Sequence, residues 1–182
     1  MPDTIVVNNE PFDVYISQEQ IRRRVKELAA QIDRDYAGKV PIFIGILNGS
    51  FIFIGDLVRE VTVDCEIDFM KLSSYGDAKI SSGQVQMVKE LNCQVSGREI
   101  LVVEDIVDTG LSVDYIRRHI LAEKPASLRF VSLLLKKGIP KIDFSIDYVG
   151  FEIPPEFVIG YGLDYGQKLR NLKAVYRQRP SA

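Results

Sequence analysis

Apolar residues follow a helical period in the first part of the chain. Between residues 17 and 37 they recur at every third or fourth position, which predicts a helix with one buried face. These recurring residues are Ile21, Val25, Leu28 and Ile32. Ser17 and Gln20 have the spacing of a capping box at the start of this helix, and Gly38 provides a stop at its end.

Short continuous apolar runs, rich in β-branched residues, alternate with amphipathic segments over the middle of the chain. The runs predict strands that are buried on both faces, and the amphipathic segments predict helices. The strands are expected at 40–47, 65–72, 99–106 and 127–137, and the helices at 50–61 and 111–123. Because strand, helix and strand follow one another, we expect an α/β fold with a mainly parallel central sheet flanked by helices.

Two other parts of the chain lack this regular alternation. Residues 73–84 are small, polar and glycine-containing, which favours a mobile loop, and 84–91 is expected to return from it as a strand. The C-terminal part has short β-like pieces at 147–153 and 157–165, separated by two prolines, as in edge or turn segments. We expect this C-terminal part to form a separate small lobe.

Composition narrows the class of protein. The chain has 182 residues, of which 46% are hydrophobic and 26% charged, and its formal net charge is −2, as in one globular domain. The absence of a basic excess argues against a nucleic-acid or membrane surface. No apolar run reaches the roughly 20 residues that span a bilayer, and the first residues do not read as a signal peptide. Cys65 and Cys93 lack metal-site spacing, so we expect free thiols in a reducing cytoplasm.

The most informative stretch runs from the buried strand at 99–106 into the helix at 111–123. Glu104 and Asp105 stand near the end of the strand, and the turn that follows reads Asp-Thr-Gly-Leu-Ser over residues 108–112. In parallel sheets, ligands bind beyond the carboxyl ends of the strands. The glycine lets the backbone approach a ligand closely, and the start of the helix points free N–H groups at an anion. The turn therefore predicts a phosphate-binding site.

The three acids of this stretch have separate candidate roles. Glu104 and Asp105 are adjacent and would face opposite sides of a regular strand, so they need not be two ligands of one metal. Ribose hydroxyls or metal-bound waters are natural partners for both carboxylates. Asp108 lies beyond the strand and could act as a base. The alternative is a helix-capping aspartate beside two solvated acids.

These residues resemble the signature of the phosphoribosyltransferase family, whose substrate is 5-phosphoribosyl 1-pyrophosphate. The resemblance extends from about residue 40 to 172, and within the family it is similar to hypoxanthine or hypoxanthine-guanine phosphoribosyltransferases of bacterial type. The additional matching segments are Ser74-Tyr75, 132–137 and 149–165. The resemblance implies a type I phosphoribosyltransferase fold in one domain, 1–182. Its core would span about 15–145, and a small C-terminal hood would span about 146–182 together with the N-terminal segment.

The resemblance also implies a role for each matching residue. The ribose and 5′-phosphate would be bound by Glu104, Asp105, Asp108, Thr109, Gly110, Leu111 and Ser112, with Asp108 as general base near N7 of the purine. The purine would be bound by Lys136, Phe157, Val158 and Asp164. Pyrophosphate would be bound by Asn48, Gly49 and Arg170, and Ser74 and Tyr75 would belong to a lid. Mg²⁺ is the implied cofactor, with Asp164, Glu104 and Asp105 as candidate ligands.

Within these implied roles, Lys136 would donate to the exocyclic O6 of the base, which adenine lacks, and Phe157 would stack on the purine face. For both, a structural role without a ligand is the alternative. The loop at 47–50 often has a non-proline cis peptide before its second residue in the family. That residue is Asn48 here, where the family commonly has Lys or Arg, so this loop lacks the positive charge that the family has at this position.

The implied reaction transfers the 5-phosphoribosyl group to N9 of hypoxanthine, and of guanine, giving IMP or GMP and pyrophosphate. Dimers or tetramers are typical of such families. Two other classes fit the fold: an RNA-binding regulator and a phosphoacceptor signalling domain. The near-neutral charge argues against the regulator. The position of the acids in mid-chain rather than near the N-terminus argues against the signalling domain.

Overall fold

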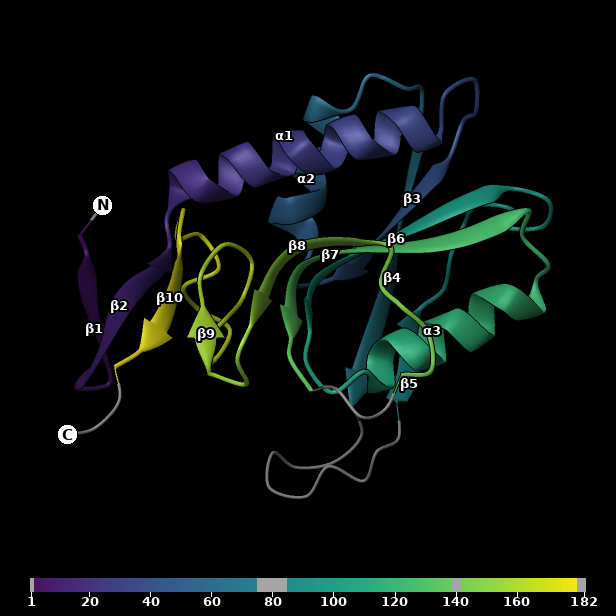
Figure 1. Ribbon diagram of the computed structural model, residues 1–182. Coiled ribbons are helices and arrows are strands. Elements are labelled where there is room, and N and C mark those ends of the chain that lie inside the picture. Colours follow the sequence, from purple (N-terminus) through teal and green to yellow (C-terminus); the bar gives the residue numbers. More distant parts are fainter. Residues whose placement is uncertain (1, 75–84, 139–141, 180–182) are drawn as a thin grey trace.

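The computed structural model describes residues 2–74, 85–138 and 142–179 (Figure 1). These residues form three helices and ten strands, and the strands make up two sheets. The larger sheet has six strands in the order β5-β4-β3-β6-β7-β8. These strands are β3 (Ile42–Leu47), β4 (Glu66–Ser74), β5 (Val85–Lys89), β6 (Glu99–Val107), β7 (Ser127–Lys136) and β8 (Tyr148–Ile153). All neighbouring pairs are parallel except β4 with β5. The expected α/β fold with a mainly parallel sheet is confirmed.

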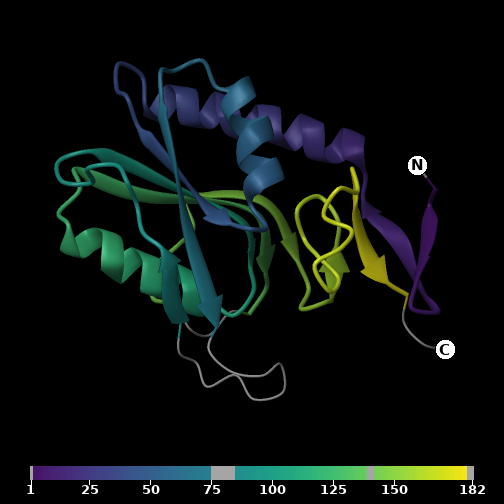
Figure 2. The same ribbon diagram turned by 180° about the vertical axis from the view of Figure 1, so that it is seen from behind.

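Helices cover both faces of the larger sheet (Figures 1 and 2). Helices α1 (Gln18–Asp35) and α2 (Phe51–Glu60) lie on one face, and α3 (Leu111–Ala122) lies on the other. Alternate residues of β3 therefore enter different cores: Phe43 packs with residues of α1 and α2, whereas Ile44 packs with residues of α3. This two-sided burial explains why the strands are continuous apolar runs rather than alternating ones.

The start of α1 follows the expected capping chemistry. The Ser17 hydroxyl accepts from the Gln20 backbone N–H at 3.2 Å, and the Gln20 side chain accepts from the Ser17 backbone N–H at 2.8 Å. The same helix is tied to the edge of the sheet, because the Arg24 guanidinium donates to the carbonyl oxygens of Val149 and Gly150 in β8.

A smaller sheet joins the two ends of the chain. Its order is β1-β2-β10-β9, all antiparallel, and its strands are β1 (Thr4–Val7), β2 (Glu10–Ile16), β9 (Val158–Ile159) and β10 (Val175–Gln178). Its core contains Phe12 and Tyr176, both fully buried. We call residues 2–16 and 154–179 the smaller lobe.

Two features of the smaller lobe differ from the expectation. The strands β1, β2 and β10 were not predicted. β1 and β2 form a short local hairpin, whereas β10 pairs with β2 from the other end of the chain. Residues 148–153, which we expected in the separate lobe, are instead β8, the edge strand of the larger sheet. The boundary expected near residue 146 therefore lies too early. Among the described residues, no helix has the length and apolar character needed to cross a bilayer.

Candidate active site

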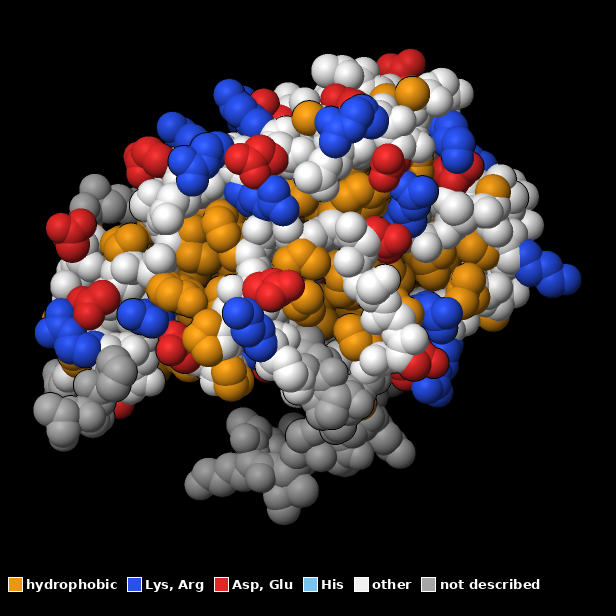
Figure 3. Space-filling view, in the orientation of Figure 1, with side chains coloured by type: hydrophobic (Ala, Val, Ile, Leu, Met, Phe, Trp, Pro, Cys, Tyr) orange, Lys and Arg blue, Asp and Glu red, His pale blue; other side chains and the backbone are white. Residues whose placement is uncertain are grey.

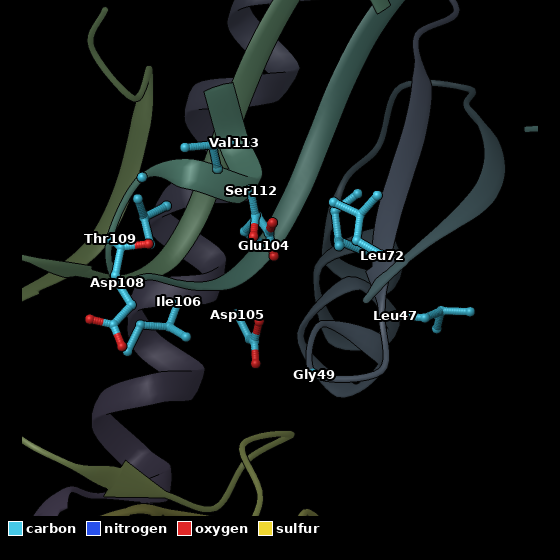
Figure 4. A pocket seen from close by; sticks show the side chains of 13 residues that line it. Leu47, Gly49, Leu72, Glu104, Asp105, Ile106, Asp108, Thr109, Ser112 and Val113 are labelled. Atoms are coloured by element: carbon cyan, nitrogen blue, oxygen red, sulfur yellow. The ribbon is translucent and has the colours of Figure 1, made fainter. Parts of the chain in front are cut away.

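A pocket opens at the carboxyl ends of β3 and β6 (Figure 4). In the sheet, β3 lies between β4 and β6. The strands that follow β3 directly in the chain, β4 and β5, lie on one side of it, and the later strands β6 to β8 lie on the other, so the strand order reverses at this point. Ligands of open α/β sheets bind at such a point. The pocket has a volume of about 220 Å³. It is lined by Ile46, Leu47, Gly49, Leu72, Glu104, Asp105, Ile106, Val107, Asp108, Thr109, Gly110, Ser112 and Val113.

The turn 108–112 connects β6 to α3 at the wall of this pocket. Gly110 has a φ of 81°, a left-handed conformation that favours glycine, and it is the residue from which α3 starts. The side chains of Thr109 and Ser112 are exposed. Gly110, Ser112 and Val113 all line the pocket, so the positive end of α3 faces it. The start of a helix that faces a pocket in this way suits an anion.

The two adjacent acids of β6 both border the pocket (Figure 4), but they have unusual surroundings. Glu104 is only 6% exposed. Burial, and next the Asp105 carboxylate, raise the pKa of Glu104 well above its usual value. Burial also raises the pKa of Asp105 to about 6, against the lowering effects of backbone N–H groups and of the Arg170 guanidinium. Burial thus favours the protonated form of Glu104, which can donate as well as accept a hydrogen bond.

Asp108 lies just outside the buried end of β6 and is exposed to the pocket. Its carboxylate forms an ion pair with the ammonium group of Lys136 at 2.9 Å. Lys136 is the last residue of β7, the parallel neighbour of β6, and its side chain is only 13% exposed. The two residues meet because parallel neighbouring strands end at the same edge of the sheet. The sequence placed both at this rim but did not predict that they pair.

The loop 47–50 follows β3 and forms the opposite wall. Its Leu47-Asn48 peptide bond is cis, at the position that the family resemblance indicated. The Asn48 side chain is exposed, whereas Gly49 packs closely against β6. A Cβ atom on Gly49 would lie 1.8 Å from the Asp105 Oδ2 atom, so only glycine fits here.

Phe157 and Val158 lie in the smaller lobe, at β9. The Phe157 ring is 50% exposed, which rules out the alternative of a core phenylalanine. It is held edge-on by the rings of Phe12 and Tyr165, with centroids at 6.3 and 5.9 Å. Val158 is buried and pairs with Arg177 of β10. An exposed aromatic face on a braced ring can stack on a planar ligand.

Asp164 and Arg170 belong to the turns between β9 and β10. Their carboxylate and guanidinium form an ion pair at 2.8 Å. The Arg170 guanidinium also donates to the Gly162 carbonyl oxygen at 2.7 Å, and the Gly162 backbone contacts Gly49, so Arg170 lies near the loop 47–50. Of the two expected lid residues, Ser74 is the last residue of β4, and Tyr75 lies outside the described residues.

Sequence reasoning missed several contacts of the site. Leu72, Ile106 and Val113 line the pocket but carry no polar group that would have marked them. It also missed Gly162, whose backbone contacts Gly49. The Gly-Tyr-Gly sequence at 160–162 was the available signal, because two closely spaced glycines often mark left-handed backbone or close approach.

Comparison with known proteins gives one consistent result. A model described as a phosphoribosyl transferase domain matches residues 15–166. The chain is 42% identical over 168 residues to the hypoxanthine-guanine phosphoribosyltransferase of Bacillus subtilis (strain 168), covering 92% of this chain and 93% of the relative. It is 43% identical over 171 residues to the enzyme of the same name from Aquifex aeolicus (strain VF5), covering 93% and 96%.

Solved structures agree with these relatives. A crystal structure of a hypoxanthine-guanine phosphoribosyltransferase from Bacillus anthracis matches with a TM-score of 0.86 at 42% identity, covering 91% of this chain and 97% of that one. A hypoxanthine phosphoribosyltransferase from Staphylococcus aureus matches with a TM-score of 0.87 at 40% identity, covering 92% and 91%.

Proposed function

The chain belongs to the phosphoribosyltransferase family, and from this we propose that it transfers the 5-phosphoribosyl group from 5-phosphoribosyl 1-pyrophosphate to N9 of hypoxanthine, and of guanine. The products are IMP or GMP and pyrophosphate, so the protein is a purine salvage enzyme. The observation that carries this proposal is the 2.9 Å pair of Lys136 and Asp108 beside the turn 108–112. This pair brings the group that recognises the purine and the general base together beside the phosphate site.

The Lys136–Asp108 pair matches one edge of a 6-oxopurine. O6 and N7 lie on the same edge of the base. Lys136 donates to O6, and Asp108 accepts the proton that leaves N7 as the bond from N9 to the ribose forms. Adenine carries an amino group at position 6, so a hydrogen-bond donor of the base would face the Lys136 ammonium group, which is also a donor. Phe157 stacks on the face of the base, and the backbone at Val158 contacts its edge.

The turn 108–112 binds the 5′-phosphate through backbone N–H groups and the hydroxyls of Thr109 and Ser112. Glu104 and Asp105 contact the ribose hydroxyls, a role that suits Glu104 because burial favours its protonated form, which can donate. The transition state resembles a ribosyl oxocarbenium ion, so the enzyme must hold base, sugar and leaving pyrophosphate in line. The loop 47–50 and Arg170 hold the pyrophosphate.

The donor set fits Mg²⁺ bound together with the sugar pyrophosphate. Within residues 2–74, 85–138 and 142–179, no group of three acidic, histidine or cysteine side chains is placed to hold a metal alone. Mg²⁺ in proteins usually takes one or two carboxylates and completes its shell with water and phosphate oxygens. Asp164 would supply a carboxylate, with Glu104 and Asp105 acting through water. When bound, Mg²⁺ would neutralise charge on the departing pyrophosphate.

The surface supports small-molecule substrates rather than RNA. On the face seen in Figure 3, Lys and Arg side chains are interspersed with Asp and Glu and do not form a continuous basic stripe. The same proposal includes a cytoplasmic location, since Cys65 and Cys93 are free thiols. It also includes assembly as a homodimer or homotetramer.

A steady-state assay tests the reaction. Purified protein is given 5-phosphoribosyl 1-pyrophosphate, Mg²⁺ and, in turn, hypoxanthine, guanine, xanthine and adenine. We expect nucleotide and pyrophosphate from hypoxanthine and guanine, and discrimination against adenine of about 10³-fold or more, because the wrong base leaves polar groups unpaired. Comparable turnover of adenine would overturn the Lys136 assignment. No turnover with any base would overturn the function.

A further inference from the structure

The smaller lobe touches the loop 47–50 through a backbone contact at Gly162. Gly162 has a φ of 100°, and a Cβ atom there would lie 2.0 Å from the Gly49 carbonyl oxygen. The two backbones are therefore in direct contact, with no room for a methyl group. Gly49 lines the pocket, together with Leu47 of the same loop.

Gly49 is also confined on its other side. A Cβ atom on Gly49 would lie 1.8 Å from the Asp105 carboxylate of β6. The Gly49 peptide thus lies between β6 and the smaller lobe. If Gly162 gained a methyl group, the Gly49 carbonyl would have to move, and Asp105 blocks the movement toward β6. The loop or the lobe would have to shift instead.

Gly162 is itself held firmly in place. Its N–H donates to the Arg170 carbonyl oxygen at 2.9 Å, and its carbonyl oxygen accepts from the Arg170 guanidinium at 2.7 Å. The preceding residue, Tyr161, makes a second contact, with the helix that follows the loop 47–50. The Tyr161 hydroxyl donates to the Asp56 carboxylate at 2.7 Å, and Asp56 lies in α2, the helix that begins directly after the loop. Tyr161 is only 5% exposed.

We propose that Gly162, supported by the Tyr161–Asp56 hydrogen bond, is a positioning residue that sets the backbone of the loop 47–50 for the pyrophosphate of the sugar substrate. The proposal rests on the function proposed above. Backbone N–H groups bind phosphate oxygens only in a defined orientation. With Asn48 in place of a basic residue, this loop offers no side-chain cation, so its contribution depends on where its backbone lies.

The consequence is a selective effect on one substrate. The contacts to O6 and to the face of the purine come from Lys136 in β7 and from Phe157, and Phe157 and Val158 lie before Gly162 and are braced by Phe12 and by β10. A disturbance at Gly162 should therefore weaken the binding of the sugar pyrophosphate more than the binding of the purine base. A role in general stability would affect both substrates alike.

The test is Gly162→Ala compared with Gly166→Ala. Gly166 lies in the same lobe and also has a positive φ, 57°, but an added Cβ would meet nothing within 4 Å. Both variants carry backbone strain, and only Gly162→Ala adds an overlap with the loop. We expect Gly162→Ala to raise the KM for 5-phosphoribosyl 1-pyrophosphate about tenfold or more, since misplacement by about 1 Å can cost 10²-fold. The KM for hypoxanthine should stay within about twofold, and Gly166→Ala should leave both KM values within about twofold.

Inhibition by inorganic pyrophosphate provides a second readout, and it should weaken by a similar factor in Gly162→Ala. Tyr161→Phe keeps the ring and removes one hydrogen bond, so it tests the proposal even if Gly162→Ala fails to fold. We expect it to raise the KM for the sugar pyrophosphate about threefold, with the KM for hypoxanthine unchanged.

The outcomes separate this inference from the proposed function. If the wild-type protein forms no nucleotide, the proposed function fails. If the wild type is active and Gly162→Ala and Tyr161→Phe keep the wild-type KM for the sugar pyrophosphate, the positioning role is wrong. Equal changes in both KM values, or a lower melting temperature alone, would also contradict it.

Discussion

At the scale of single residues, the pocket is defined by where its charges can be neutralised. Lys136 and Asp108 form an ion pair at the rim, at 2.9 Å, whereas burial raises the pKa of Glu104 well above its usual value. Burial also raises the pKa of Asp105, to about 6. The two adjacent carboxyl groups of β6 thus differ from exposed ones because burial disfavours their charged form.

Replacing Lys136 should remove the hydrogen bond that recognises O6 of the purine. For Lys136→Ala we expect kcat/KM with hypoxanthine to fall about 10- to 100-fold, since a hydrogen bond from a charged group contributes about 1.5–3 kcal/mol. Selectivity over adenine should shrink by the same factor. Lys137→Ala is the matched control, because its exposed side chain follows directly in the chain. Steady-state kinetics with both bases measures this, and unchanged selectivity in Lys136→Ala would refute it.

Replacing Asp108 should affect chemistry more than binding. Asn keeps the size of the side chain but cannot take up the N7 proton, so we expect kcat of Asp108→Asn to fall about 10²- to 10⁴-fold. Asp114→Asn is the control, since Asp114 lies in the first turn of the adjacent helix α3 and pairs with Arg118. Near-normal turnover with hypoxanthine in Asp108→Asn would remove Asp108 from the role of base.

At the scale of elements, a buried carboxylate connects β4 to the chain entering β6. Asp68 of β4 is 8% exposed and accepts from the backbone N–H groups of Asn92 and Cys93 at 2.6 and 2.9 Å. Burial alone would raise the pKa of Asp68, but hydrogen bonds from the backbone N–H groups of Cys93, Phe69 and Asn92 hold it at about 2. This contact organises the return from β5 toward the strand that bears the site.

The lowered pKa of Asp68 predicts a pH-dependent contribution to stability. Because about 2 lies below the usual value of 3.8, the unfolded chain binds this proton first on acidification. The stabilisation is therefore complete above about pH 4 and is lost as the pH falls toward 2. We expect Asp68→Asn to lower the free energy of unfolding by about 2 kcal/mol at pH 7. Denaturant titrations should show the loss of unfolding free energy in Asp68→Asn becoming smaller between pH 4 and pH 2.5. The control Asp64→Asn, at an exposed residue, should show no loss. A loss in Asp68→Asn that stays constant with pH would contradict the pH dependence expected from its lowered pKa.

At the scale of the whole molecule, the smaller sheet ties both ends of the chain to Phe157, the residue proposed to stack on the purine. Strands β2 and β10 pair over 12–16 and 175–178, and β10 in turn pairs with β9, which follows Phe157. Phe12 is fully buried in this sheet and meets the Phe157 ring edge-on. The N-terminal hairpin therefore supports the Phe157 ring, although it lies far from that residue in the sequence.

Truncating Phe12 should reveal this support. We expect Phe12→Ala to destabilise the protein by about 3–5 kcal/mol, through the lost burial and the cavity left behind. The KM for hypoxanthine should rise more than that for the sugar pyrophosphate, because the turn 108–112 belongs to the other sheet. Val6→Ala, at a residue that is 71% exposed in β1, serves as the control. Thermal unfolding and two-substrate kinetics test this, and equal effects on both substrates would speak against it.

The elements that the sequence predicted well are those whose pattern is local. The helix at 18–35 has its cap and apolar stripe within its own residues, and β3 and β6 are continuous apolar runs. The expected piece at 157–165 became a strand over Val158–Ile159 only, because its glycines and turns interrupt the pairing. Strand β10 could not be predicted, since one of its partners, β2, lies at the other end of the chain.

The sequence by itself determined the α/β alternation and the place of the turn 108–112, of the acids and of the lysine at the ends of the buried strands, because each depends on neighbouring residues and on the direction of parallel strands. Only the tertiary structure decided that Gly49 lies between Asp105 and Gly162, that Lys136 meets Asp108, and that Glu104 is buried deeply enough to raise its pKa. These features arise from packing between segments that are distant in the chain, and a linear pattern carries no measure of the space or the dielectric that such packing creates.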